Sequence, residues 1–386
     1  MTTGGAEGRK TPEPDSGSGH ECMSAGTSKL GSVVDNTLSD ARGGQPQFPW
    51  QPGSATGIGS MPGTDPAEAM RIIAGELPDF PFLPELPDRG PGADLTGRTA
   101  ALLVDLPVEI TPGGWRIAER PGRYMRAARS MLSSDLDALE EALSGYEGPL
   151  KVSLCGPWTL AATIELPRTL NAAVSDSGAV ADIAASLAEA AAAHVAEVAR
   201  RVPGARVVLQ FDEPALGAVA RGEVPTASGL SRLPAIDAAV MADRLGTVLA
   251  AAECYTVVHC CATAVPFGII MDARPGGMAF DLSLLRREDA DRVAEAAERG
   301  LGILAGAVPA LSEPGRSDEP ADTARRVLRF WRRLGLAAEQ CAEQVVITPA
   351  CGLAGAPPAA AQDTLAHCRQ AARMVPELAA EKEDGA

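Results

Sequence analysis

The chain has 386 residues, of which 46% are apolar and 4% are aromatic, so we expect a large core built mainly of Ala, Leu, Val and Ile. Its formal net charge of −16 argues against binding to nucleic acid or to a membrane surface, because acidic surfaces repel phosphate groups. No stretch approaches the roughly 18 apolar residues of a membrane span, and no signal peptide is visible. We therefore expect a cytoplasmic protein with reduced cysteines and a small-molecule partner.

Residues 1–47 are rich in Gly, Ser, Thr, Asp and Pro, a composition that buries too little apolar surface to order the chain. We expect them to form a disordered tail. A single folded domain is predicted over residues 48–378, followed by a flexible C-terminus at 379–386.

Eight short apolar runs alternate with longer Ala-rich runs of helical spacing. The strand candidates are 55–60, 101–105, 151–155, 206–212, 256–260, 278–282, 302–305 and 344–348. The helix candidates are 66–77, 130–143, 179–201, 235–252, 289–299, 323–334 and 363–374. Nearly continuous apolar strands that alternate with helices are typical of a parallel sheet covered on both faces. The pattern predicts an α/β fold, a (β/α)8 TIM barrel.

The second strand is the least certain of the eight. The stretch 80–86 competes with 101–105 for this position, but its prolines weaken it as a strand. The Gly- and Pro-rich segment 84–125 is expected to form loops over one end of the barrel.

An open, doubly wound sheet is the alternative architecture. It requires a glycine-rich phosphate loop after the first strand. The segment 57–63 does not have this glycine spacing, because Pro62 occupies the wrong position. The barrel is therefore favoured.

Three soft metal-ligand candidates follow strand ends, where barrel enzymes carry their reactive groups. Residues two apart in a strand point the same way, so His259 and Cys261 can face one ion while Cys260 faces away. Cys351 follows the last strand and reaches the same rim. Two thiolates and an imidazole suit Zn²⁺. Asp281, at the end of the sixth strand, is a candidate oxygen ligand or a contact to the ligands.

These residues also have plainer interpretations. A cysteine is often a small core residue, but a second cysteine on the same predicted rim favours a metal site. Asp212 and Glu213 end the fourth strand, where carboxylates can bind a substrate ammonium group. The same pair, followed by Pro214, also suits the start of a helix. We take Asp212 as the catalytic candidate.

With these motifs, the sequence resembles the catalytic domain of cobalamin-independent methionine synthase, in its short single-barrel form. Several blocks between about residues 54 and 375 match in order. They are Ile58-Gly59-Ser60-Met61-Pro62, Gly156-Pro157-Trp158-Thr159-Leu160, Gln210-Phe211-Asp212-Glu213-Pro214-Ala215-Leu216, His259-Cys260-Cys261 and Cys351-Gly352-Leu353.

The resemblance implies a barrel of the uroporphyrinogen-decarboxylase and methionine-synthase group, and methyl transfer to the thiolate of homocysteine. It implies zinc on His259, Cys261 and Cys351, with an acidic fourth ligand for which Asp281 is the candidate. It also implies that Asp212 holds the substrate ammonium and that Ser60 lies near the substrate carboxylate. Ile58 and Glu85 are two further candidate substrate-binding residues.

The sequence departs from the family pattern where the methyl donor binds. Thr163 stands near the position of the Trp that stacks on folate, and Ala218 stands near that of an acidic residue. The family's proton-donating His has no counterpart between Gly302 and Ser312. The donor therefore stays open between methyl-folate and a methylated corrinoid protein.

Other functions stay open as well. The protein could methylate a different thiol, such as coenzyme M, or act as a non-catalytic zinc- or thiol-binding regulator. A decarboxylase on the same barrel would need basic residues for its substrate carboxylates, and the sequence places none on the rim.

Overall fold

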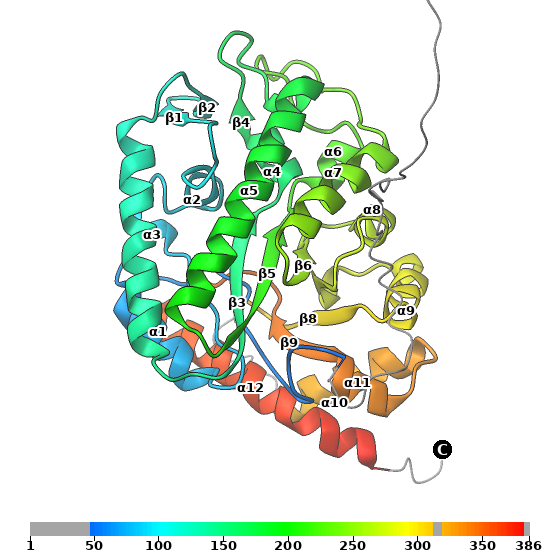
Figure 1. Ribbon diagram of the computed structural model, residues 1–386. Helices are drawn as coiled ribbons and strands as arrows, with labels where there is room; N and C mark the ends of the chain where they lie inside the picture. Colours follow the sequence, from blue (N-terminus) through cyan, green and yellow to red (C-terminus); the bar gives the residue numbers. More distant parts are fainter. Residues whose placement is uncertain (1–46, 312–318, 382–386) are drawn as a thin grey trace, which may run out of the picture. The chain divides into compact units, whose positions relative to one another are not determined.

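The computed structural model describes residues 47–311 and 319–381, and the predicted tail at 1–47 lies, except for Gln47, outside these ranges. Its centre is a curled parallel sheet of six strands in the order β3-β5-β6-β7-β8-β9 (Figure 1). The strands are β3 (Gly148–Cys155), β5 (Ala205–Asp212), β6 (Tyr255–His259), β7 (Gly277–Asp281), β8 (Gly302–Val308) and β9 (Val345–Pro349).

Two extended segments join the edge strands β9 and β3. The first begins beside β9, where Thr56 N donates to Ile347 O at 3.2 Å. It pairs with the second segment through a bridge between Ser60 and Glu85. The second segment reaches β3, where Leu83 N donates to Lys151 O at 2.9 Å. The ring of eight extended segments is therefore complete, and two of them are too short or irregular to form named strands.

Helices cover the outside of this ring. The longer ones are α1 (Pro66–Glu76), α3 (Arg123–Ala142), α5 (Ser177–Arg201), α7 (Ala238–Ala251), α9 (Ala290–Glu298), α10 (Pro320–Arg333) and α12 (Pro358–Ala380). The shorter ones are α2 (Leu95–Ala100), α4 (Pro157–Thr163), α6 (Leu216–Ala220), α8 (Phe267–Asp272) and α11 (Ala338–Gln344). All seven predicted helices are present, and α12 includes residues 379 and 380 of the expected flexible end.

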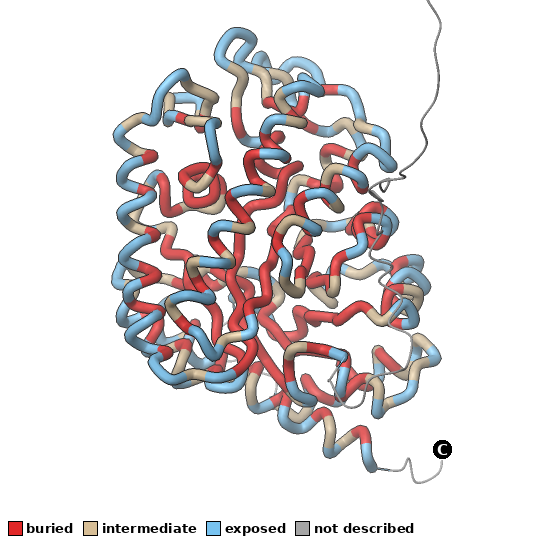
Figure 2. Tube along the Cα trace, in the orientation of Figure 1, coloured by how far each residue is buried: buried red, intermediate tan, exposed pale blue. Residues whose placement is uncertain are grey.

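Within the described ranges, one helix, α5, is long and apolar enough to cross a membrane by length and composition alone. Its buried side chains, among them Ile183, Leu187 and Val198, belong to the main hydrophobic cluster of the barrel. Figure 2 shows the same alternation of buried and exposed residues along this helix as along the other helices of the ring. We therefore describe α5 as a core helix of the barrel.

The prediction of a second strand at 101–105 is wrong. These residues follow α2, which starts where the Asp94 side chain accepts a hydrogen bond from Gly97 N at 2.8 Å. The competing stretch at 80–86 takes the strand position. Its prolines are tolerated because the N–H groups it needs belong to Leu83 and Glu85.

The segment 84–125, expected to form loops, contains regular structure besides α2. Strands β1 (Val108–Thr111) and β2 (Gly114–Ile117) form a hairpin, and β4 (Ile164–Glu165) adds a third strand beside β2. This small sheet lies away from the amino-terminal end of the barrel, near the end of α4 and the start of α5 (Figure 1).

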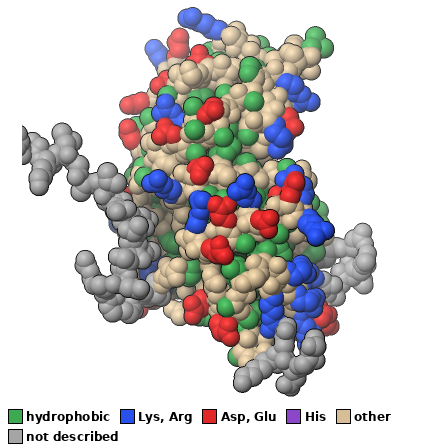
Figure 3. All heavy atoms as spheres, turned by 90° about the vertical axis from the view of Figure 1, so that its right-hand side faces the viewer, with side chains coloured by type: hydrophobic (Ala, Val, Ile, Leu, Met, Phe, Trp, Pro, Cys, Tyr) green, Lys and Arg blue, Asp and Glu red, His purple; other side chains and the backbone are tan. Residues whose placement is uncertain are grey.

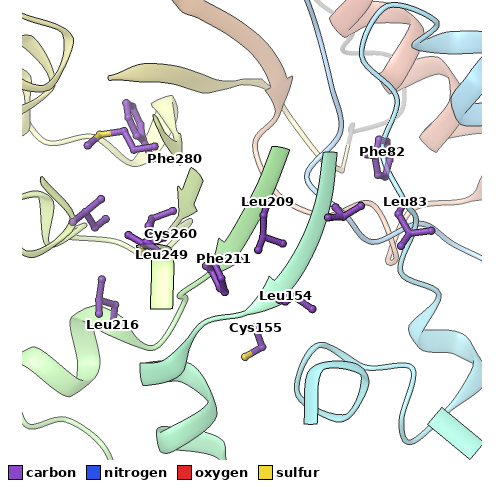
Figure 4. Packing of buried hydrophobic residues seen from close by; sticks show 14 of the residues in the cluster. Phe82, Leu83, Leu154, Cys155, Leu209, Phe211, Leu216, Leu249, Cys260 and Phe280 are labelled. Carbon is purple, nitrogen blue, oxygen red and sulfur yellow. The ribbon is translucent and has the colours of Figure 1, made fainter. Parts of the chain in front are cut away.

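The core has an outer and an inner part. The outer part lies between the sheet and the helices, and Figure 4 shows side chains such as Leu154, Leu209 and Phe211 within it. The inner part fills one end of the ring with apolar residues. Its members are Phe48, Trp50, Phe80, Val208, Val257, Ala279, Leu304 and Val346.

The acidic composition does not produce a uniformly acidic surface. On the face seen in Figure 3, acidic and basic side chains are interspersed. Several of them are paired on helix surfaces, as Arg299 is with Glu295. Exposed pairs of this kind contribute little to stability, so the surface charge mainly affects solubility and association.

Candidate active site

Neighbouring strands place a carboxylate beside an imidazole. Asp212 ends β5 and His259 ends β6, and the two residues are paired in the parallel register. Their side chains meet, with Asp212 Oδ1 at 2.6 Å from His259 Nδ1. The other ring nitrogen, Nε2, is buried and has no hydrogen-bond partner among the described residues. A carboxylate that fixes one ring nitrogen and leaves the other available is typical of a metal-binding histidine.

A buried glutamine continues this arrangement into the barrel. Gln210 Nε2 donates to Asp212 Oδ1 at 2.8 Å and to the Ile58 carbonyl at 2.9 Å. Ile58 O also accepts from the Ser153 hydroxyl and from the Lys151 ammonium. The orientation of the imidazole is therefore tied, through Asp212 and Gln210, to the first extended segment.

Two cysteines from distant parts of the chain meet at the rim, the carboxyl ends of the strands. The sulfur atoms of Cys261 and Cys351 lie 3.4 Å apart. Their S–H···S hydrogen bond, with a smaller contribution from nearby His259, outweighs the effect of burial and lowers the pKa of Cys351 to about 6. The same hydrogen bond raises the pKa of Cys261 above its usual range. The hydrogen bond therefore couples the two thiols and favours ionisation of one of them.

The donor set fits a soft metal ion, although its members are not gathered around one point. Two sulfurs bound to one zinc ion are about 3.8 Å apart for tetrahedral bonds of roughly 2.3 Å, close to the separation of Cys261 and Cys351. The buried Nε2 of His259 is a third donor that lacks a partner. Within 47–311 and 319–381, no three His, Cys, Asp or Glu side chains form a group that could hold a metal.

Asp281, the candidate fourth ligand, has local partners. It ends β7, as predicted, and its Oδ1 accepts hydrogen bonds from Ser283 N at 2.8 Å and from the Ser283 hydroxyl at 2.7 Å. These bonds stabilise the turn that follows the strand. Its role as a ligand stays a prediction.

Ser60 packs directly against the turn that carries Cys351. Leu353 N donates to Ser60 O at 2.8 Å. A Cβ atom on Gly352 would lie 2.1 Å from the Ser60 hydroxyl oxygen. The first extended segment and the cysteine turn are therefore in close contact, and only a residue without a side chain fits at position 352 without a shift.

A buried group of charged residues adjoins Ser60. Glu85 is paired with Ser60 through a backbone bridge and is 5% exposed. Burial raises its pKa to about 7, while the charge of Arg98 opposes the shift. Arg98 and Lys151 are also fully buried, and burial lowers the pKa of Lys151 to about 8.

Neither cation was predicted from the sequence, and neither lies at the carboxyl end of a strand, since Lys151 is in the middle of β3 and Arg98 is in α2. A sequence pattern could have indicated that Lys151 is buried, since Lys151 and Ser153 alternate with apolar residues in a strand expected to be buried. No pattern indicated this for Arg98, because it lies in the segment expected to form loops. Both cations face carboxylates and carbonyl oxygens, so the structure does not offer them as free carboxylate-binding groups.

Glu213 has a structural role at the start of a helix. The sequence allowed such a role for the Asp212-Glu213 pair, but for the helix that follows Pro214 and not for α4. The Glu213 carboxylate accepts hydrogen bonds from Trp158 N, Thr159 N and the Thr159 hydroxyl, at 2.7 to 2.9 Å. It therefore caps the start of α4, in the neighbouring Gly-Pro-Trp-Thr block. A Cβ atom on Gly156 would collide with this carboxylate at 2.4 Å, so two of the matched sequence blocks are in direct contact.

Comparisons with known proteins indicate the family and the fold. The family model for the catalytic domain of cobalamin-independent synthase matches residues 54–374. Among solved structures, a B12-independent methionine synthase from Shewanella sp. W3-18-1, in complex with selenomethionine, is similar with a TM-score of 0.55 and 12% identity. The match covers 85% of this chain and 98% of that chain. No curated protein matches the sequence. The predicted barrel is confirmed.

Proposed function

Because the chain belongs to the family of cobalamin-independent synthase catalytic domains, which are methyltransferases, we propose that it methylates the thiol of homocysteine to form methionine. The observation that carries the proposal is the sulfur pair of Cys261 and Cys351 on the rim, 3.4 Å apart. Two cysteines separated by ninety positions have no packing reason to meet at a partly exposed strand end, whereas a shared ligand supplies one.

We propose zinc as the resident metal, held by His259, Cys261 and Cys351, with Asp281 as the candidate fourth ligand. The thiol pair, and the imidazole that Asp212 orients, support this assignment. When bound, zinc favours the ionised form of a thiol at neutral pH. The protein's part is to fix the two sulfurs and the imidazole before the substrate arrives.

Asp212 and Glu85 are the proposed acceptors for the substrate ammonium group. Oδ1 of Asp212 is occupied by Gln210 and His259, whereas its Oδ2 has no hydrogen bond to any described residue. Ser60 and Ile58 lie on the same extended segment, and we assign Ser60 to the substrate carboxylate. A thiol compound without an ammonium group would leave the second oxygen of Asp212 without a partner, which favours an amino-acid substrate over coenzyme M.

The transfer itself moves a methyl group from a donor to the substrate sulfur. A carbon–sulfur bond forms, the bond from carbon to the donor breaks, and the donor keeps that electron pair. Fixing both partners lowers the entropic barrier to such a step. The donor stays open between methyl-folate and a methylated corrinoid protein. At the position of the folate-stacking Trp, the Thr163 hydroxyl is instead hydrogen-bonded to Thr96 at 3.1 Å and to Thr159 O.

We also propose that the protein works in the cytoplasm. The seven cysteines within the described ranges are all free. Free thiols, two of them close enough to oxidise to a disulfide, are suited to a reducing compartment.

The proposal is tested by zinc content and activity in the Cys351→Ala and His259→Ala variants. Both should lose zinc and methyl transfer together, while the fold persists. Growth rescue of a methionine auxotroph, with and without cobalamin, then separates the two donor classes. Zinc binding without any methyl transfer would favour the regulatory alternative, and full activity of a zinc-free Cys351→Ala protein would refute the proposal.

A further inference from the structure

Arg98 is a buried cation whose position is unusual. It comes from α2, outside the ring, and its guanidinium reaches the wall of the barrel. Its Nη1 donates to Ser153 O at 2.9 Å and lies 3.4 Å from Glu85 Oε1. The side chains of Arg98 and Glu85 are 1% and 7% exposed. An ion pair so far from water interacts strongly, because little solvent screens it.

Stability alone does not account for this arginine. Its Nε and Nη2 are buried without partners among the described residues, and unmet buried donors cost free energy. Arg89 shows the contrast, because it donates two hydrogen bonds to Asp135, at 2.7 and 2.8 Å, and a third to Leu86 O. The pairing with Glu85 is therefore the feature of Arg98 that needs an explanation.

The backbone fixes Glu85 at the proposed substrate site. Glu85 N donates to Gly59 O at 3.0 Å, and Glu85 O accepts from Met61 N at 2.8 Å, so both of its backbone groups bond to the segment that carries Ser60. Only the side chain has freedom to move.

Four charged groups act on this carboxylate. Arg98 from α2 and Lys151 from β3 favour its ionised form, while Asp212 from β5 and Asp94, the cap of α2, disfavour it. Burial also disfavours it, so that its pKa is raised to about 7. Arg98 is the largest of the charge effects, so its loss would raise the pKa of Glu85 further and favour the neutral carboxyl.

We propose that Arg98 is a positioning residue, whose guanidinium holds the Glu85 carboxylate charged and oriented to receive the ammonium group of the amino-acid substrate. The inference rests on the proposed function, since it assumes that Glu85 contacts the substrate. If so, α2, which lies in the segment 84–125, contributes to substrate recognition.

The test measures homocysteine affinity by calorimetry on the full-length, zinc-loaded protein. Relative to the wild type at the same pH, Arg98→Met should weaken binding about tenfold or more near pH 6.5, and the gap should narrow towards about pH 9, as Glu85 ionises unaided. Arg98→Lys keeps the charge and should retain most of the affinity. An equal loss at every pH in Arg98→Met, or no rescue by lysine, would mean that the arginine is merely structural.

A double variant tests whether Arg98 acts through Glu85. In a Glu85→Gln background there is no carboxyl to keep charged, so Arg98→Met should cause no further loss of affinity. Additive losses would overturn the proposal.

Arg89→Met provides the matched control. It breaks the buried pair with Asp135, so it should lower stability without a pH-dependent effect on affinity. If the wild-type protein binds zinc but no homocysteine, the proposed function fails. A pH-independent defect in Arg98→Met, with normal wild-type binding, overturns only the inference about Arg98.

Discussion

Along β5, the side chains that face the barrel interior change from Val208 to Gln210 to Asp212, and along β6 they change from Val257 to His259. The valines belong to the apolar cluster with Phe48 and Trp50 at one end of the ring. The polar residues lie at the other end, where they bond to each other and to Ile58 O. The same strands therefore build two regions of opposite chemistry.

The apolar end of the barrel contributes mainly to stability, and the polar end contributes mainly to the proposed site. At the apolar end, Trp50 is stacked on Phe48 and Phe80, with ring centroids 5.3 and 5.9 Å away. At the polar end and next to it, side-chain atoms of Thr56, Gln210 and Thr348 are buried without partners among the described residues. Buried polar atoms without hydrogen bonds lower the free energy of unfolding. Packing at the apolar end must therefore offset this destabilisation.

We expect the largest change in stability from a substitution at the apolar end. Trp50→Ala should lower the free energy of unfolding by about 3 to 5 kcal/mol, because a buried aromatic side chain leaves a cavity. Denaturant unfolding measures the loss. Homocysteine affinity of the protein that stays folded should match the wild type, and Trp50→Phe should recover part of the stability. A loss of affinity in folded Trp50→Ala would show that the two ends are coupled.

At the polar end, Gln210→Leu should affect zinc binding at the proposed site more than it affects the stability of the fold. It removes the donor that holds Asp212, and loss of such a supporting contact lowers metal affinity or activity by roughly 10- to 100-fold. Competition with a chelator measures zinc affinity.

A second buried glutamine gives the control for this change. Gln344 donates to Ala297 O and Leu301 O, at 2.9 and 2.6 Å, on the outside of the ring. Gln344→Leu should therefore reduce stability and leave zinc affinity unchanged. Equal effects of the two substitutions on zinc would contradict the division between the ends.

The sequence was sufficient to predict the strands of the sheet and the pairing of rim residues, because continuous apolar runs and period-two spacing are local signals. It placed His259, Cys261 and Cys351 at strand ends, and the structure brings the two sulfurs together. It misplaced the second strand, because an apolar run at 101–105 resembles a strand more than the proline-containing stretch 80–86 does.

The contacts of the buried charges could not be predicted from local patterns. The apolar residues around Lys151 indicate that it is buried, but they do not indicate that its ammonium group bonds to Ile58 O on another segment. The position of Arg98 depends on how α2 folds back onto the barrel, which is a tertiary effect that local spacing does not encode. Glu85 was found only through the resemblance to a family.

Stability should also depend on pH differently at the two ends. The pKa of Glu85 is about 7 in the folded protein, against an ordinary value of 4.5. Between these two pH values the folded state holds a proton that the unfolded state has released. Rising pH therefore lowers the free energy of unfolding, by about 1.4 kcal/mol for each pH unit in this window. Glu85→Gln removes this dependence.

The measurement is therefore a difference between two pH profiles. The stability of Glu85→Gln relative to the wild type should increase from about pH 4.5 to about pH 7 and stay level above that. Trp50→Ala, which removes no titrating group, should differ from the wild type by a constant amount over the same range. A flat difference for Glu85→Gln would contradict the raised pKa of this carboxyl.

The smallest effect is expected where the cysteine turn meets the first extended segment. In Gly352→Ala, the new Cβ would lie 2.1 Å from the Ser60 hydroxyl oxygen, while the other atoms around it are at 3.3 Å or beyond. The collision is confined to one small group that can rotate, so overpacking should cost about 1 kcal/mol, at the low end of the usual range. Homocysteine affinity should fall by less than about tenfold, and zinc should stay bound. If the hydroxyl is the cause, Gly352→Ala should add nothing to Ser60→Ala, because the double variant has no clash. Additive losses would instead place the strain in the backbone of the turn, and Cys351 would then be held less firmly than its contact with Ser60 indicates.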